Sequence, residues 1–193
     1  WNPDGVPPFV AGDTFNLNAI DILANSISTV DFNATLGIIN IGDTNFTNSW
    51  TLNSTGGAVL TLNNNGVAAQ INQSANSLGD TISVPLAIAG DLNINNASTT
   101  LARTLLINGG ITSAAASGVQ TILFNGITAG AATLDGGIGD GGTGGSIGIA
   151  VQGGTTAIIQ SVNLRGTNSF SGPVVVGVVT GTVGAGLNYL FLN

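Results

Sequence analysis

The chain has 193 residues, 43% of them hydrophobic, so it can form a single domain with a substantial buried core. Only 6% are charged, as two Arg and nine Asp, which gives a net charge of −7. The absence of Lys, His, Glu and Cys excludes a Ser-His-Asp triad, a lysine base, disulfides and thiolate metal sites. Two cations cannot neutralise a phosphate backbone, so nucleic acid is not an expected partner.

The composition also predicts the secondary structure. Strong helix formers are scarce, whereas 30 Gly accompany many Asn, Thr, Val and Ile. This mixture favours short strands and tight corners over helices. The sequence therefore predicts an all-β protein.

The first strand is predicted just after an entry segment, residues 1–14. Three prolines in the first eight positions remove backbone donors and disfavour a central strand there. Trp1 and Phe9 are placed to cap the first turn of a repeat fold, with a loose leader as the alternative. Beyond this segment, Phe15 and Leu17 alternate with Asn and begin the strands.

A short phrase then recurs along the chain, in which an apolar strand ends in Asn or Gly. It is found at Leu60–Gly66, Leu92–Asn96, Leu105–Gly110, Ile122–Gly126, Ile149–Gly154 and Val162–Gly166. Asn and Gly tolerate the left-handed conformation that corners require, and several short strands per turn would produce the irregular spacing. The pattern predicts one β-solenoid domain over residues 1–193. A β-sandwich with exchanged strands remains the alternative.

The most glycine-dense stretch, residues 135–148, is interpreted as a loop excursion between turns. It contains Asp135 and Asp140, the closest acidic pair. Gly136 to Asp140 falls one residue short of the G-G-x-G-x-D phrase of calcium-binding β-rolls. Because oxygen ligands suffice for calcium, these two aspartates are the candidate calcium ligands, with plain turn residues as the alternative. No other cofactor is predicted.

The C-terminal part is uncharged and apolar from residue 172 to residue 192. Its broken runs of Gly, Thr and Val predict strands rather than a membrane helix. The last strand is expected within residues 186–193, where Leu187, Tyr189 and Phe191 alternate with other residues.

This last strand also predicts self-assembly. Neither charge nor proline protects it, and unprotected edge strands pair with other chains. We expect Leu187, Tyr189 and Phe191 to stack on the first turns of another copy, where Phe15 and Leu17 offer an apolar face. Such a head-to-tail contact does not close and so gives filaments. The alternative is continuation into further repeats of a longer chain.

Two motifs carry a family resemblance. Trp1–Pro7, followed by Ala11–Thr14, resembles the entry segment of bacterial autotransporter-associated β-strand repeat proteins. Leu164–Val176 resembles their repeat, with Pro173 where the family usually has Gly. The resemblance implies a right-handed parallel β-helix, export from the cell and a structural or adhesive role, with no catalytic residues to carry over.

The expected function is therefore non-enzymatic and extracellular: a cell-surface scaffold, an adhesin stalk or a fibre subunit. A carbohydrate-binding or carbohydrate-cleaving β-helix, with surface glycans as ligands, would need a groove of aromatics and carboxylates, and only 5% of the residues are aromatic. An ice-binding solenoid would need stacked Thr-x-Thr rows, and Thr180–Thr182 is the single clear instance. Five N-x-[ST] sequons, at Asn33, Asn45, Asn53, Asn72 and Asn96, are weak evidence for glycosylation.

Overall fold

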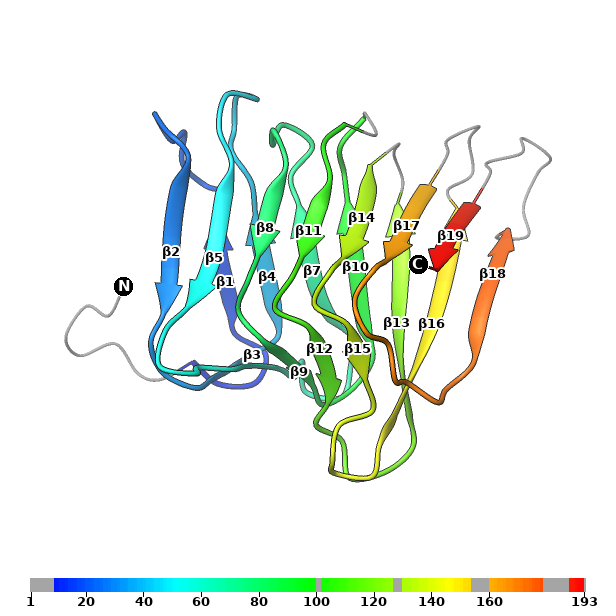
Figure 1. Ribbon diagram of the computed structural model, residues 1–193. Coiled ribbons are helices and arrows are strands. Elements are labelled where there is room, and N and C mark those ends of the chain that lie inside the picture. Colours follow the sequence, from blue (N-terminus) through cyan, green and yellow to red (C-terminus); the bar gives the residue numbers. More distant parts are fainter. Residues whose placement is uncertain (1–8, 100–101, 127–129, 154–159, 179–187, 193) are drawn as a thin grey trace.

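The protein is a parallel β-solenoid of about six turns, as seen in a computed structural model (Figure 1). The structure describes residues 9–99, 102–126, 130–153, 160–178 and 188–192. This described part contains strands, turns and bends, and no helix. The all-β prediction is confirmed.

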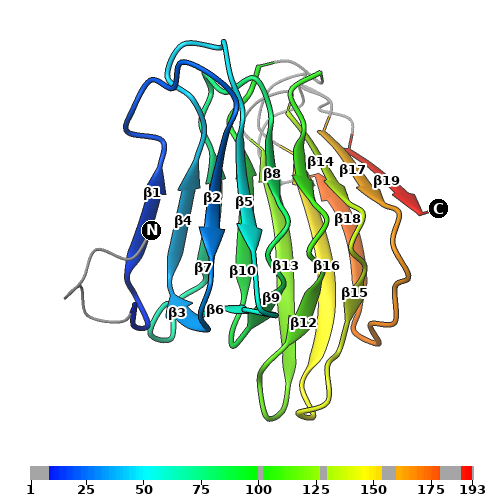
Figure 2. The same cartoon turned by 60° about the vertical axis from the view of Figure 1, so that its left-hand side comes forward.

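Three sheets run along the solenoid, and successive turns add strands to each of them in the same order (Figures 1 and 2). Sheet A consists of β1 (Thr14–Leu17), β4 (Ile38–Ile41), β7 (Ala69–Gln73), β10 (Leu92–Asn96), β13 (Val119–Gly126), β16 (Ser146–Gly153) and β18 (Val174–Val178). Sheet B consists of β2 (Ser26–Val30), β5 (Trp50–Ser54), β8 (Asp80–Ile82), β11 (Leu105–Ile107), β14 (Ala131–Leu134), β17 (Gln160–Leu164) and β19 (Asn188–Leu192). The shorter sheet C consists of β3 (Ala34–Leu36), β6 (Leu60–Leu62), β9 (Leu86–Ile88), β12 (Ile111–Ser113) and β15 (Ile138–Gly139).

The strand pairing decides between the two predicted folds. Each strand pairs in parallel with the equivalent strand of the next turn. A β-sandwich is built from antiparallel neighbours, so the sandwich alternative is wrong. Equivalent residues of successive turns lie 24, 32 and 23 residues apart in the first turns of sheet A. These unequal turns explain why the sequence has no strict repeat.

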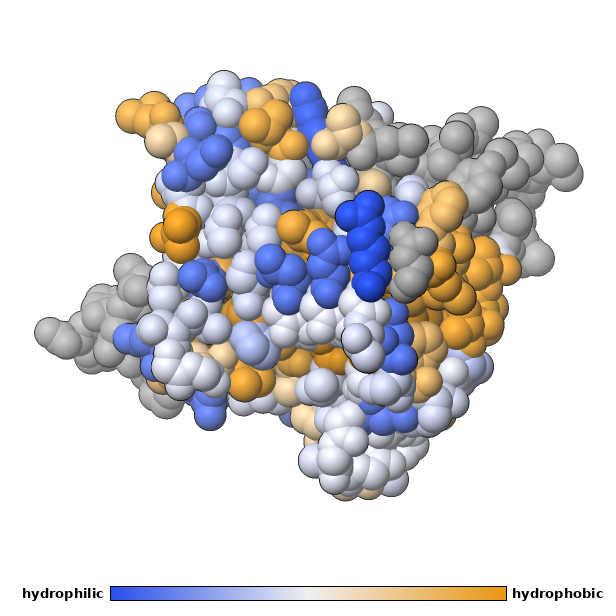
Figure 3. All heavy atoms as spheres, in the orientation of Figure 1, coloured by the Kyte–Doolittle hydropathy of each residue, from blue (hydrophilic) through white to orange (hydrophobic). Residues whose placement is uncertain are grey.

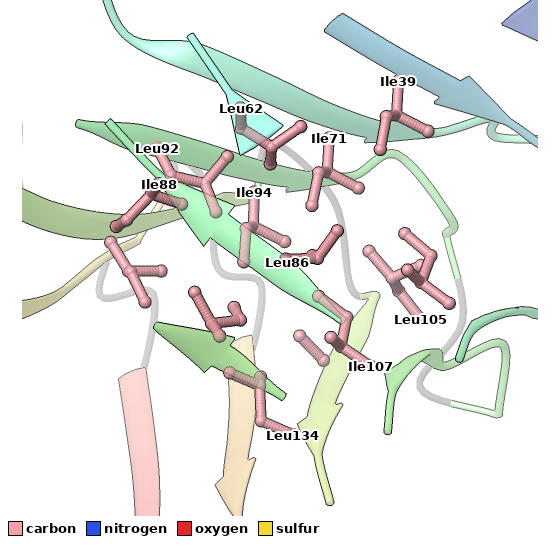
Figure 4. Close-up of a cluster of buried hydrophobic side chains, with 14 of the residues drawn as sticks. Ile39, Leu62, Ile71, Leu86, Ile88, Leu92, Ile94, Leu105, Ile107 and Leu134 are labelled. Atoms are coloured by element: carbon pink, nitrogen blue, oxygen red, sulfur yellow. The ribbon is translucent and has the colours of Figure 1, made fainter. Parts of the chain in front are cut away.

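The core consists of inward-facing side chains that stack in columns along the solenoid axis. In a strand, successive side chains point to opposite faces, so parallel in-register pairing aligns every second residue. One column of sheet A is formed by Phe15, Ile39, Ile71, Ile94, Phe124, Val151 and Val176. Figure 4 shows Ile39, Ile71 and Ile94 from this column beside Leu and Ile side chains of the other two sheets.

Glycines permit close contact between turns at the corner between sheets B and C. A Cβ atom at Gly109 would lie 2.2 Å from the carbonyl oxygen of Val84, and one at Gly136 would lie 2.1 Å from the backbone nitrogen of Gly110. Gly110 and Gly137 also have positive φ angles, of 79° and 81°. The corner role predicted for the recurring phrase is thus confirmed at Gly109 and Gly110.

The interpretation of residues 135–148 as one loop excursion needs correction. The segment contains β15, which joins sheet C, and Ser146 already belongs to β16. Only residues 140–145 form a loop, which projects with residues 114–118 below the other turns in Figure 1. The glycine density misled the prediction because several of these glycines serve close packing rather than a free loop.

Candidate functional surfaces

Asp135, the first candidate calcium ligand, lies at the corner that follows β14. Its backbone N–H donates to the carbonyl oxygen of Ile107, and one turn later Arg165 makes the equivalent bond to Leu134. The two residues therefore occupy the same corner position on adjacent turns, and both are exposed. The positive charge of Arg165 at the equivalent corner of the next turn disfavours calcium binding at Asp135.

Asp140, the second candidate ligand, lies on the other side of β15, at the start of loop 140–145. Its Oδ1 accepts backbone hydrogen bonds from Ile147 at 2.8 Å and Ser171 at 3.1 Å. These hydrogen bonds, the one from Ile147 first, lower the pKa of Asp140. Within the described residues, no group of three or more Asp side chains is placed to hold a metal ion. Asp140 therefore holds the backbone of this corner in place through the hydrogen bonds that it accepts from Ile147 and Ser171.

Two other aspartates, Asp43 and Asp80, are buried where sheet A turns into sheet B. Burial raises the pKa of Asp43, but hydrogen bonds from three backbone N–H groups and the Thr47 hydroxyl outweigh burial and lower it. Burial also raises the pKa of Asp80, and there it prevails over hydrogen bonds from the Ser77 hydroxyl and the Trp50 N–H. The charge of Asp43 raises the pKa of Asp80 further.

Buried amides continue this polar corner in the next turns. Gln73 Nε2 donates to Asn96 Oδ1 at 3.2 Å, and Asn96 Nδ2 donates to the carbonyl oxygens of Arg103 and Ala131. Asn96 is thus committed to the interior, which makes its sequon inaccessible in the folded chain. In the described part, Gln73 Oε1 and Trp50 Nε1 are buried without a hydrogen-bond partner. These buried hydrogen bonds connect the corner residues of successive turns.

The outward face of sheet A carries a row of hydrogen-bonded asparagines, the outer asparagine row. Asn40 Nδ2 donates to Asn16 Oδ1 at 2.7 Å, Asn72 donates to Asn40 at 2.9 Å and Asn95 donates to Asn72 at 2.7 Å. The side-chain amides thus repeat the turn-to-turn bonding of the backbone, as they do in stacked parallel sheets. Asn72 Nδ2 also donates to Gln70 Oε1 at 3.3 Å, on the same strand.

The outward face of sheet B carries a row that changes character along the solenoid, the sheet B outer row. In register, it is formed by Ile27, Thr51, Thr81, Leu106, Thr133, Asn163 and Phe191. Its middle is mostly polar, whereas its two ends are large apolar side chains. Ile27 is 67% exposed and Phe191 is 46% exposed.

The N-terminal end of the solenoid is apolar and hollowed. Phe9 packs edge-on against Phe15, with ring centroids 5.7 Å apart. A cavity of about 570 Å³ opens beside Phe15, Leu17, Ile27 and Trp50. Phe15 and Leu17, the predicted assembly residues, are both partly buried and lie together on β1, the first strand of sheet A.

The C-terminal end is also apolar. Val174, Val175 and Val176 of β18 and Phe191 and Leu192 of β19 are exposed, and Figure 3 shows orange surface gathered over these two strands, whereas the middle of this face is white and blue. The predicted last strand is confirmed as β19, and the backbone of Tyr189 lies in it. Leu187, like Thr180–Thr182, lies outside the described residues.

Ile27 was not predicted from the sequence as part of the N-terminal end surface. The valine run of β18 signals an unprotected strand, whereas an isolated Ile27 carries no signal until the register places it opposite a partner. Within the described residues, no helix has the length and apolar character needed to cross a membrane.

Comparison with known proteins finds no matching family model, no matching curated sequence and no matching solved structure. The β-solenoid fold is therefore the level at which this chain is classified.

Proposed function

We propose that this chain is a non-enzymatic structural protein of the cell exterior, acting as a surface scaffold, an adhesin stalk or a fibre subunit. One observation carries the proposal: the same in-register stacking runs through about six turns, and the first and last described strands of sheets A and B are uncharged. A unit of this kind extends along one axis, by copies of itself or by further repeats of a longer chain.

The distribution of polar groups supports a structural role. The buried polar side chains of Asp43, Asp80 and Asn96 are engaged in hydrogen bonds that fix corners. Catalytic carboxylates need an open site and a reacting geometry, and these groups have neither. The outer asparagine row likewise binds turn to turn, which stiffens the solenoid along its axis.

The extracellular location rests on the motif resemblance and on composition. Trp1–Pro7 and Leu164–Val176 resemble segments of autotransporter-associated β-strand repeat proteins, which are surface or secreted proteins. With only Arg103 and Arg165 as cationic residues, the chain offers trypsin-like proteases two cleavage points. Both features suit a protein exposed outside the cell.

Light scattering on the purified chain tests the fibre form of this proposal. The intact chain should form polymers at high concentration, and a chain lacking residues 187–193 should stay monomeric because the last strand of sheet B is removed. Thr51→Ser, a conservative change on a middle turn, is the matched control and should polymerise like the intact chain. An intact chain that remains monomeric at high concentration would contradict assembly into fibres.

Carbohydrate binding is the second candidate, and the outer asparagine row is the observation that favours it. Amides repeated about 4.8 Å apart, the spacing of neighbouring strands, suit the repeating hydroxyl groups of a polysaccharide. A glycan array tests this candidate: binding lost in Asn72→Ala but kept in Thr51→Ser would support it. The threonines of sheet B give less support to ice binding, because Leu106 interrupts the row after Thr81.

A further inference from the structure

We propose that copies of this chain join end to end in the register of their own internal turns, with β18 of one copy against β1 of the next and β19 against β2. The joint would place Phe191 of one copy beside Ile27 of the next. This inference rests on the proposed structural function and names its partner, a second copy of the chain. It also specifies the contact between the copies.

The internal turns define what such a joint requires. Each turn presents one strand of sheet A and one of sheet B, and the next turn covers both with parallel strands in register. In the described part, β1 and β2 are the first strands of their sheets and β18 and β19 are the last. A second copy thus offers the same two strands, in the same order and direction, as a further turn would.

The inward columns would continue across the joint. Val176 ends the column that begins with Phe15, and Leu192 ends the column that begins with Ser28. Val176 is 48% exposed and Leu192 is 66% exposed, unlike the fully buried middle members of their columns. A copy stacked in register covers Val176 with Phe15 and Leu192 with Ser28, which removes both exposed apolar side chains from water.

The sheet B outer row indicates the partner most specifically. A single exposed apolar side chain is ordinary on a protein surface, whereas exposed apolar surface gathered at the two ends of one row marks a contact site. The exposed large apolar residues of this row stand at its two extremes, Ile27 on β2 and Phe191 on β19, whereas Leu106 in the middle is half-buried. Head-to-tail stacking in register brings the two apolar extremes together and shields both from water.

No charge repulsion between the end strands opposes contact between two copies. None of the four end strands contains a charged residue. Charged or proline-containing edge strands are the usual protection against such pairing, and it is missing here. Because the surface used at one end differs from the surface used at the other, the contact repeats without closing and produces a filament.

Cysteine cross-linking tests the register, since the natural chain has no cysteine. Neighbouring parallel strands lie about 4.8 Å apart, within the Cα separation of about 4.4–6.8 Å that a disulfide accepts. Ile27→Cys and Phe191→Cys are prepared as separate proteins, mixed and mildly oxidised. The mixture should give several-fold more covalent dimer than either protein alone, and the double variant should give a ladder of covalent oligomers.

Two controls make the result decisive. Thr51→Cys with Thr81→Cys in one chain pairs two residues that are already neighbours in the sheet B outer row, so this disulfide should close readily. Thr29→Cys mixed with Phe191→Cys is off register by two residues, or about 8 Å, and should not cross-link above background. Both end positions are exposed, so the variants should fold normally.

The outcomes separate this joint from the proposed function. Cross-linking of Ile27→Cys with Phe191→Cys at only the level of the Thr29→Cys control would overturn the joint, provided the Thr51–Thr81 control closes. If the intact chain nevertheless forms polymers, the structural function stands and only the register is wrong. If the intact chain stays monomeric, the joint and assembly into fibres are both contradicted.

Discussion

The middle turns and the two end turns of the solenoid are built from the same kinds of strand but present different side chains to solvent. In the middle, inward residues such as Ile94 are covered on both sides, and outward residues of sheet B such as Thr81 are mostly polar. At the ends, inward Leu192 and outward Ile27 are both apolar and exposed. The middle turns therefore hold the buried core, and the exposed apolar side chains of the end turns are the surfaces that the proposed joint would use.

The largest expected effect comes from placing a charge in a middle turn. Ile94→Asp should unfold the chain, because an unpaired buried carboxylate costs several kcal/mol, comparable to the whole stability of a domain. Ile107→Asp should do the same, since Ile107 is equally buried. Far-UV circular dichroism and urea titration measure the outcome.

Ile27→Asp is the matched control at the end turn, and it should fold normally while losing assembly. A folded Ile94→Asp protein of unchanged stability would remove the distinction between middle and end turns. It would also show that Ile94 faces outward.

A smaller loss of stability is expected from substitutions in the outer asparagine row. Asn72→Ala removes two bonds of the row, one donated to Asn40 and one accepted from Asn95, and also a longer bond to Gln70, whereas Asn16→Ala removes one bond at the end of the row. At about 0.5–1.5 kcal/mol for each hydrogen bond of the row, Asn72→Ala should cost about 1–3 kcal/mol and Asn16→Ala about half as much. Equal unfolding free energies for the two variants would mean that the row does not act as a connected unit.

Asp80 should make the folded protein less stable as the pH rises, whereas a carboxylate with a lowered pKa makes it more stable. The folded state raises the pKa of Asp80 above its ordinary value of 3.8, so the folded protein holds the proton more tightly than the unfolded chain. Stability should therefore fall as the pH rises through the range above 3.8. Asp80→Asn should remove this decline, as measured by urea unfolding across pH 4 to 7.

Asp43 provides the contrast for that experiment. Its pKa is lowered in the folded state, so its contribution to stability is present above its ordinary value of 3.8 and is lost as the pH falls below it. Asp80→Asn should leave this loss at acidic pH unchanged. An unaltered stability profile above pH 4 in Asp80→Asn would show that Asp80 carries no penalty when ionised.

The smallest expected effect concerns calcium. Chelation should leave the melting temperature unchanged, because Asp140 Oδ1 already accepts two backbone hydrogen bonds and Arg165 occupies the corner next to Asp135. Asp135→Asn with Asp140→Asn is the control. A chelator that lowers the melting temperature of the native chain but not of this variant would establish the calcium site.

The sequence was sufficient for the fold because corners and strands leave local signals. Asn and Gly mark positions where the backbone turns or approaches its neighbour, as at Gly109, and apolar alternation marks the inward columns. The glycines at 136 and 137 were harder to interpret, since close packing and loop flexibility both favour glycine. Local chemistry alone does not separate the two.

The outward rows could not be predicted, because they depend on register between turns of unequal length. Asn40 bonds to Asn16 across 24 residues, and Asn72 bonds to Asn40 across 32 residues. Without a fixed period, no inspection of the sequence places Ile27 and Phe191 in one row. The alignment of Ile27 with Phe191 emerged only when the parallel pairing of every turn was known.

Fibre diffraction from aligned, concentrated protein is the most direct test of the central claim, that this solenoid extends end to end through its first and last turns. The account predicts filaments with strands perpendicular to the filament axis and a reflection at about 4.8 Å along that axis, continuous through the joints. Filaments whose 4.8 Å reflection lies across the axis, or a solution of monomers that never forms filaments, would contradict it.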